Sequence, residues 1–183
     1  MSALANVSPS TPPSVILVMG VSGSGKTTIA ALLAGMLHWE LADADSLHPE
    51  ANVRKMRSGI PLTDEDRAPW LRAVARWIDA TRQSGKRGVI TCSALKRSHR
   101  EILIDDRPDV RLAYLKGDRE LIARRMVARQ GHFMPLALLR SQLETLEEPG
   151  PDERAVIVSI AASPHDIALR IIAKLNLQQA THP

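Results

Sequence analysis

The sequence GVSGSGKT at residues 20–27 constrains this chain more than any other feature. A short apolar run, SVILVMG at 14–20, precedes it, and apolar residues at helical spacing follow it from Lys26. Strand, glycine-rich loop and helix, with lysine and threonine closing the loop, form the pattern of a phosphate-binding loop. Glycines permit backbone angles that turn several N–H groups toward one anion, and the helix dipole adds to the attraction. The sequence therefore predicts that phosphate binds here.

Two side chains of this loop carry specific chemistry. Lys26 has the reach to contact the β- and γ-phosphates of a nucleotide, and the Thr27 hydroxyl suits Mg²⁺. A glycine-rich turn without function is the alternative, which the strand before and the helix after the loop disfavour. The sequence has no N/T-K-x-D pattern for reading guanine, and this favours ATP over GTP.

The rest of the chain alternates between strand-like and helix-like segments. This order predicts an α/β fold with a five-stranded parallel sheet, helices on both faces, and ligands at the carboxyl ends of the strands. The glycine loop, the aspartates after the second strand and the CSALK loop after the third should therefore meet at one edge. We expect strands at 14–20, 38–45, 88–95, 110–117 and 155–160, and helices from Lys26, at 49–57, 69–83 and 97–105, after Asp118, at 135–147 and from Ser163.

Composition limits the class of protein. A length of 183 residues with 44% hydrophobic content suits one globular domain, and we expect residues 1–13 to be a disordered tail. The sequence contains no apolar segment of 18 residues, so we expect no membrane span. The net charge is +4, but the basic residues are interspersed with acidic ones and form no continuous basic stripe. Only 3% of residues are aromatic, so nucleic acid is not the expected partner. The single cysteine, Cys92, excludes an internal disulfide and fits the cytoplasm.

Asp43 and Asp45 end the expected second strand. On an extended chain, residues two apart project to the same side. Beside bound phosphate, one carboxylate would hold a water of Mg²⁺ and the other would accept the proton of a substrate hydroxyl. A pair of solvated aspartates that cap a turn is the alternative.

Two groups of arginines are further candidates. Arg125 and Arg129 are four residues apart on one predicted helix, so they share a face that could stabilise transferred charge. A solvated basic helix is the alternative for them. Arg67 lies in DEDRAPW at 64–70. Helix capping accounts for the acidic residues of this segment, and a surface salt bridge is the simplest interpretation of Arg67. His132 is by default an ordinary loop histidine.

With these residues in place, the sequence resembles the gluconokinases, small P-loop kinases related to shikimate and nucleoside monophosphate kinases. The P-loop is widely shared, whereas the segment from LHP to DEDRAPWL, with CSALK and GHF, is far more specific. The chain differs from many members in carrying Ala44, and not glycine, between the two aspartates. The motifs are GVSGSGKTT at 20–28, DADSLHPEANVRKMRSGIPLTDEDRAPWL at 43–71, CSALKRSHRE at 92–101, YLKGD at 114–118, ARQGHFMP at 128–135 and QLETLEEPGPDE at 142–153.

The resemblance implies ATP- and Mg²⁺-dependent phosphorylation of D-gluconate by a homodimer. It implies one kinase domain over 14–177, with a substrate-binding segment at about 46–84, a mobile lid at about 126–140 and a C-terminal tail at 178–183. Asp45 would be the base or hydroxyl-positioning residue, Asp43 the partner of Mg²⁺ through water, and Arg129 the lid arginine at the phosphates. Substrate-facing residues would be His48, Asn52, Arg67 and Lys96. The ATP-binding residues would be Gly20, Val21, Ser22, Gly23, Ser24, Gly25, Lys26, Thr27, Thr28 and Arg125.

Three alternatives stay open. A shikimate- or nucleotide-type kinase would share the phosphate loop, because that loop reads phosphates only. A binding module that closes on ATP without phosphoryl transfer has less need of Asp45. A nucleic-acid end kinase would show strongly salt-dependent binding to oligonucleotides.

Overall fold

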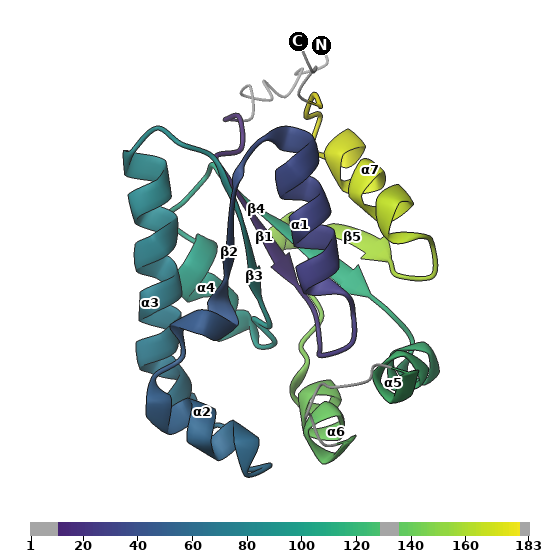
Figure 1. Ribbon diagram of the computed structural model, residues 1–183. Coiled ribbons are helices and arrows are strands. Elements are labelled where there is room, and N and C mark those ends of the chain that lie inside the picture. The colour runs from purple at the N-terminus through teal and green to yellow at the C-terminus, as the bar shows by residue number, and fades with distance from the viewer. Residues whose placement is uncertain (1–10, 129–135, 180–183) are drawn as a thin grey trace, which may run out of the picture.

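The protein is a three-layer α/β domain, seen here in a computed structural model that describes residues 11–128 and 136–179 (Figure 1). Its sheet has five strands in the order β2-β3-β1-β4-β5, and every neighbouring pair is parallel. The predicted fold class is confirmed. The strands are β1 Val15–Met19, β2 Glu40–Asp43, β3 Gly88–Cys92, β4 Val110–Lys116 and β5 Val156–Ser159.

Helices cover both faces of this sheet and crowd its carboxyl edge. In Figure 1, α1 and α7 lie on one face and α3 and α4 on the other, while α2, α5 and α6 stand beyond the strand ends. Short 3₁₀ turns occupy Ala44–Leu47 and Pro151–Glu153. The helices are α1 Lys26–Leu37, α2 Glu50–Arg57, α3 Asp64–Gln83, α4 Arg97–Ile104, α5 Arg119–Ala128, α6 Leu136–Thr145 and α7 Pro164–Lys174.

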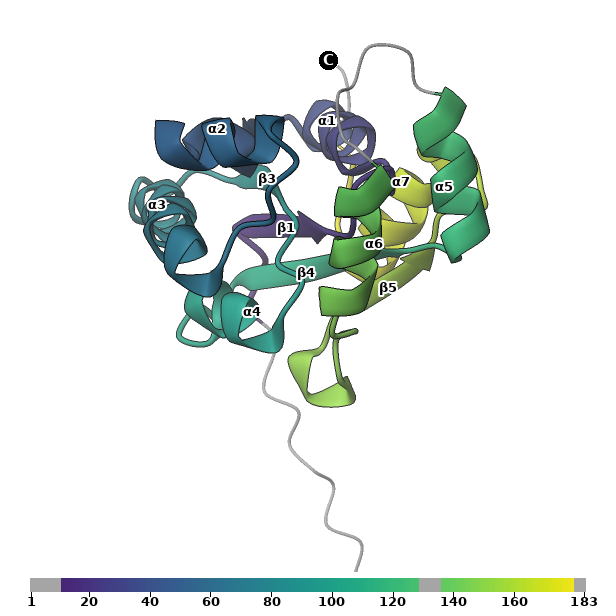
Figure 2. The same ribbon diagram turned by 90° about the horizontal axis from the view of Figure 1, so that it is seen from below.

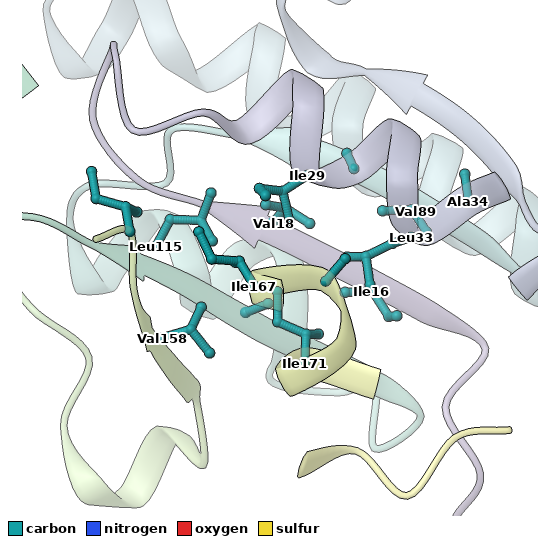
Figure 3. Close-up of a cluster of buried hydrophobic side chains, with 14 of the residues drawn as sticks. Ile16, Val18, Ile29, Leu33, Ala34, Val89, Leu115, Val158, Ile167 and Ile171 are labelled. Atoms are coloured by element: carbon teal, nitrogen blue, oxygen red, sulfur yellow. The ribbon is translucent and has the colours of Figure 1, made fainter. Parts of the chain in front are cut away.

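Strand β1 is the centre of the core, and this explains its unbroken apolar sequence. Ile16 and Val18 face α1 and α7, as Figure 3 shows, and Leu17 joins the cluster of α3. All five residues of β1 are fully buried. A strand covered on both faces has no polar side to alternate with. The strand is thereby fixed, and with it the loop that leaves its carboxyl end.

The structure corrects two boundaries. Helix α3 begins at Asp64 and not near Pro69, because a capping box of Thr63 and Asp66 starts the helix and Pro69 lies inside it. Strand β2 stops at Asp43, so Asp45 lies in a 3₁₀ turn and not on an extended strand. The argument that placed the two carboxylates on one side of a strand was therefore wrong.

Other predicted boundaries hold. Asp118 accepts the N–H of Leu121 at the start of α5, and Ser163 accepts the N–H of Asp166 at the start of α7. No helix in the described part of the chain is long and apolar enough to cross a membrane.

Candidate active site

The glycine loop joins β1 to α1 at the carboxyl edge of the sheet (Figure 1). Gly23 and Gly25 have φ angles of 81° and 95°, a region that side chains disfavour, and Gly25 is the N-cap of α1. A Cβ on Gly23 would lie 2.7 Å from Cγ of Met126, so helix α5 packs directly over the loop. The loop therefore has the backbone that a phosphate cradle needs, at the positive end of a helix.

A pocket opens in front of this loop, and we call it the phosphate-loop pocket. Lys26 lines it and donates from Nζ to the carbonyl of Val21 at 3.2 Å. The aspartates after β2 reach the same pocket, as the sheet topology predicted. Its lining residues are Ser22, Gly23, Gly25, Lys26, Thr27, Thr28, Asp43, Asp45, Thr91 and Met126.

Asp43 and Asp45 meet at this pocket through the turn, and not through an extended strand. The Asp43 carboxylate accepts the N–H of Asp45 at 3.0 Å and the hydroxyl of Thr91 at 2.7 Å. Ala44 between them is fully buried, and its carbonyl accepts the indole N–H of Trp70 at 2.6 Å. The methyl group of Ala44 thus belongs to the core, and Thr91 and Trp70 fix the turn that carries both acids.

A second pocket, the adjoining pocket, shares Ser22, Lys26 and Asp45 with the first. It extends away from the phosphate loop toward α2 and α3. Two of the predicted substrate residues, His48 and Arg67, are in its wall. Its lining residues are Ser22, Lys26, Asp45, His48, Met56, Ile60, Pro61, Leu62, Arg67, Ser93, Ser141 and Gln142.

The polar groups of the adjoining pocket are held by their surroundings. The His48 ring stacks on Trp70 with ring centroids 4.2 Å apart. Burial, with help from the nearby Arg67 charge, lowers the pKa of His48 to about 4, so its imidazole is neutral at neutral pH. Arg67 donates from Nε to the carbonyl of Leu62 at 3.4 Å, and burial lowers its pKa. An arginine nevertheless keeps its charge, so this pocket presents one guanidinium and one neutral imidazole.

Asn52 and Lys96 are not among the described residues that line either pocket. Asn52 is buried and donates from Nδ2 to the carbonyl of Asp66 at 2.7 Å, with His48 Nδ1 3.5 Å away. Lys96 pairs with Asp64 at 2.6 Å. Asn52 therefore lies behind the pocket wall, whereas Lys96 forms an ion pair at the surface.

The predicted lid arginines divide between described and undescribed parts of the chain. Arg125 donates from Nη2 to the carbonyl of Ile160 at 2.7 Å, and its Nη1 lies 4.0 Å from the position of a Cβ on Gly25. This brings Arg125 next to the phosphate loop. Arg129 and His132, with the expected lid over 129–135, lie outside the described residues.

Sequence reasoning missed several residues that shape the site. From the sequence, Trp70 is interpreted as a core residue and Thr91 as a strand residue. Their hydrogen bonds to Ala44 and Asp43 depend on tertiary contacts that the sequence does not reveal. Gln142 of α6 accepts the N–H of Ser22 at 2.7 Å, 120 residues away in sequence. The only sequence signal for Gln142 was its place in the QLETLEEPGPDE motif.

Arg100 was missed as well, and it ties two of the quoted motifs together. This buried side chain pairs with Glu153 and donates to the carbonyls of Ala94 and Glu147. The first carbonyl lies in the CSALK loop, and the second lies in the segment that follows α6. Arg100 therefore joins the CSALK loop to the segment that follows α6.

The described residues also fit a magnesium ion that arrives with a nucleotide. They contain no cluster of three His, Cys, Asp or Glu side chains able to hold a metal by themselves. Mg²⁺ in kinases needs few protein ligands, because phosphates and water supply the rest. Thr27 and Asp43, which line the same pocket, match that requirement.

Comparisons with known proteins agree with this geometry. The profile of the AAA domain family matches residues 15–149. A gluconokinase of Gluconobacter oxydans is 50% identical over 147 residues, covering 80% of this chain and 83% of that protein. The crystal structure of a sugar kinase from Janibacter has 47% identity and a TM-score of 0.87, covering 93% of this chain and all of that one. The crystal structure of a gluconokinase from Sinorhizobium meliloti has 43% identity and a TM-score of 0.81, covering 90% of this chain and 92% of that one. On this similarity, and with the phosphate-loop pocket in place, the chain belongs to the gluconokinase family of P-loop kinases.

Proposed function

We propose that the protein transfers the γ-phosphoryl group of ATP to the terminal hydroxyl of D-gluconate, which yields 6-phospho-D-gluconate. The observation that carries this proposal is that the two pockets share Ser22, Lys26 and Asp45. One pocket has the backbone of a phosphate cradle, and the other offers a guanidinium and polar groups to a small anion with hydroxyls. The shared residues are where phosphoryl transfer would take place.

On the donor side, the phosphate loop holds the phosphates of ATP. Lys26 pairs with the β- and γ-phosphates, and Thr27 and Asp43, which line the same pocket, would hold Mg²⁺, Asp43 through water. When bound, Mg²⁺ neutralises charge on the phosphates as the transferred group leaves. Arg125, next to Gly25, lies on the nucleotide side, and Arg129 is assigned to the phosphates through the family resemblance.

On the acceptor side, Arg67 binds the carboxylate of gluconate. A guanidinium fork can hold a carboxylate bidentately, and a buried anion without such a partner would be costly. His48, neutral because of its lowered pKa, hydrogen-bonds to hydroxyls. We place Asn52 behind His48 as a support of this wall, and Lys96, which pairs with Asp64 at the surface, outside it.

Transfer then requires only that the two substrates are aligned. The terminal hydroxyl oxygen bonds to the γ-phosphorus, the bond from that phosphorus to the β–γ bridging oxygen breaks, and ADP leaves. The proton of the hydroxyl passes to the Asp45 carboxylate, which lines both pockets. Positioning and charge stabilisation supply most of the rate in such a reaction, so Asp45 orients the hydroxyl as well as accepting its proton.

We also propose that the kinase acts as a homodimer in the cytoplasm. The family resemblance supports the dimer, and a chain with Cys92 as its single cysteine suits a reducing compartment. Light scattering of the purified protein tests the dimer.

The experiment that tests the proposed function is a panel of acceptors. Purified protein with Mg²⁺-ATP is given gluconate, other sugar acids, shikimate and nucleoside monophosphates, and ADP release is followed by a coupled assay. We expect turnover with gluconate, and 6-phosphogluconate dehydrogenase should oxidise the product. Turnover with shikimate or a nucleotide alone would reject the acceptor but keep the kinase chemistry. Binding of an ATP analogue without turnover of any acceptor would favour the binding-module alternative.

A further inference from the structure

Arg67, the cation of the adjoining pocket, lies among acidic residues at the start of α3. Its Nε donates to the carbonyl of Leu62, which turns the side chain back toward the first turn of this helix, where Asp64 and Asp66 lie. Burial lowers the pKa of Arg67, and the charges of Asp64 and Asp66 act in the opposite direction, as carboxylates close to a guanidinium do. Asp64 lies three residues before Arg67 and therefore on the same face of α3. An ion pair between these two side chains would be expected.

Arg67 nevertheless forms no ion pair with any carboxylate in the described part of the chain. Both neighbouring acids are held by lysines instead. Oδ2 of Asp64 accepts from Nζ of Lys96 at 2.6 Å. Both oxygens of the Asp66 carboxylate accept from Nζ of Lys55 at 2.7 Å. The guanidinium of Arg67 is thus left without a carboxylate, although two lie close to it.

The two lysines come from segments on either side of α3. Figure 2 shows α3 between α2 and α4. Lys55 lies on α2, and Lys96 is the N-cap residue of α4, at the end of the CSALK loop. The buried ring of His99 on α4 adds a second contact, with its Nε2 3.6 Å from Oδ1 of Asp64. Helix packing therefore brings a competing partner to each acid.

The acids themselves serve the helix. Asp66 completes the capping box with Thr63, and carboxylates in a first turn interact favourably with the helix dipole. The start of α3 thus needs acids, whereas the adjoining pocket needs a cation that a substrate carboxylate can bind. Lysines on the neighbouring segments meet both requirements, because they neutralise the acids and leave the arginine unpaired.

We propose that Lys96 is a positioning residue for the acceptor: by holding the carboxylate of Asp64, it leaves the guanidinium of Arg67 free to bind the carboxylate of gluconate. This deepens the proposed function and rests on it. Lys96 acts through Asp64 and does not contact gluconate, which agrees with its ion pair at the surface, outside the pocket wall. Without Lys96, Asp64 competes with gluconate for Arg67, and the acceptor must displace an internal ion pair before it binds. Lys55 holds Asp66 in the same way.

Rescue by a second substitution tests this role. Lys96→Gln releases Asp64, so KM and Kd for gluconate should rise about threefold, the range for exposed ion pairs, while kcat and the Kd of an ATP analogue stay as in the wild type. Lys96→Gln combined with Asp64→Asn removes the competitor as well, and should return both values to those of the wild type. The measurements are made at low ionic strength, where surface charges interact most strongly. Lys86→Gln, which breaks an exposed ion pair with Glu40, is the matched control and should match the wild type.

A neutral acceptor sharpens the test. D-Gluconamide lacks the carboxylate, so its KM should be the same in the wild type and in Lys96→Gln. A direct contact between Lys96 and gluconate would leave the loss unrescued by Asp64→Asn, and that result overturns the inference. A Lys96→Gln protein with the KM of the wild type overturns it as well. In both cases normal turnover of gluconate by the wild type leaves the proposed function standing. If the wild type does not phosphorylate gluconate, both are overturned.

Discussion

The phosphate-loop pocket and the adjoining pocket share three residues, yet they are built in opposite ways. The first is dominated by one continuous segment, 20–28, that turns backbone groups toward an anion. The second collects side chains from the turn after β2, α2, the start of α3, the loop after β3, and α6. Phosphate is a common group that backbone N–H donors can bind, whereas an acceptor with several hydroxyls must be read by side chains from several directions. The difference predicts which substrate each substitution should affect.

The largest effect should come from the donor side. Lys26→Ala should lower kcat by about 10²–10³, because a positioned charge at the transferred group is lost. The Kd of gluconate, measured by calorimetry, should stay within about threefold, and the melting temperature should be unchanged. Lys86→Ala, which removes an exposed lysine paired with Glu40, is the control. A folded Lys26→Ala protein with near-normal kcat would remove the phosphate-binding role.

Next comes the residue on the border between the pockets. Asp45→Asn keeps the size of the side chain but removes the proton acceptor, so kcat should fall about 10–100-fold. This lies at the low end for a catalytic base because phosphoryl transfer depends mostly on positioning. Kd for an ATP analogue and Kd for gluconate should both change little. Asp106→Asn, at an exposed position, serves as the control. Normal turnover by Asp45→Asn would assign the proton to another group.

A substitution on the acceptor side should change one substrate only. Arg67→Lys keeps the charge but loses the fork that binds a carboxylate, so KM for gluconate should rise about tenfold. KM for ATP should change less than twofold. Arg72→Lys, an exposed position on the same helix α3, should behave as the wild type. Equal increases in both KM values would contradict the division between the two pockets.

The last effect is on stability and concerns pH, to which His48 of the adjoining pocket should contribute. Because burial lowers the pKa of His48 to about 4, from an ordinary value near 6.5, the unfolded chain binds more protons than the native protein between these values. The free energy of unfolding should therefore fall as pH falls, and His48 alone should contribute about 2 kcal/mol of this loss between pH 7 and 5. Urea unfolding of His48→Gln should show a shallower dependence on pH. An unchanged slope in His48→Gln would reject the assignment.

The elements that the sequence predicted best are those with local causes. The buried run of β1, the glycines of the phosphate loop and the caps at Asp118 and Ser163 each act within a few residues. The start of α3 was misplaced because Pro69 was taken as the first turn of the helix, whereas the capping box of Thr63 and Asp66 starts the helix at Asp64. Asp45 was misplaced because a hydrogen bond from Trp70, 26 residues on from Ala44, bends the chain into a turn.

The sequence by itself determined the α/β order of the elements, the phosphate loop and the presence of two acids after the second strand, because short-range backbone preferences and periodic burial specify all three. Tertiary structure alone decided which polar side chains face the acceptor. It buried Asn52 behind the wall, paired Lys96 with Asp64 at the surface, joined Arg100 to Glu153, and brought Gln142 to Ser22. The physical reason is that a side chain's partners across the fold depend on how whole helices pack, and the spacing of residues along the chain does not specify that packing.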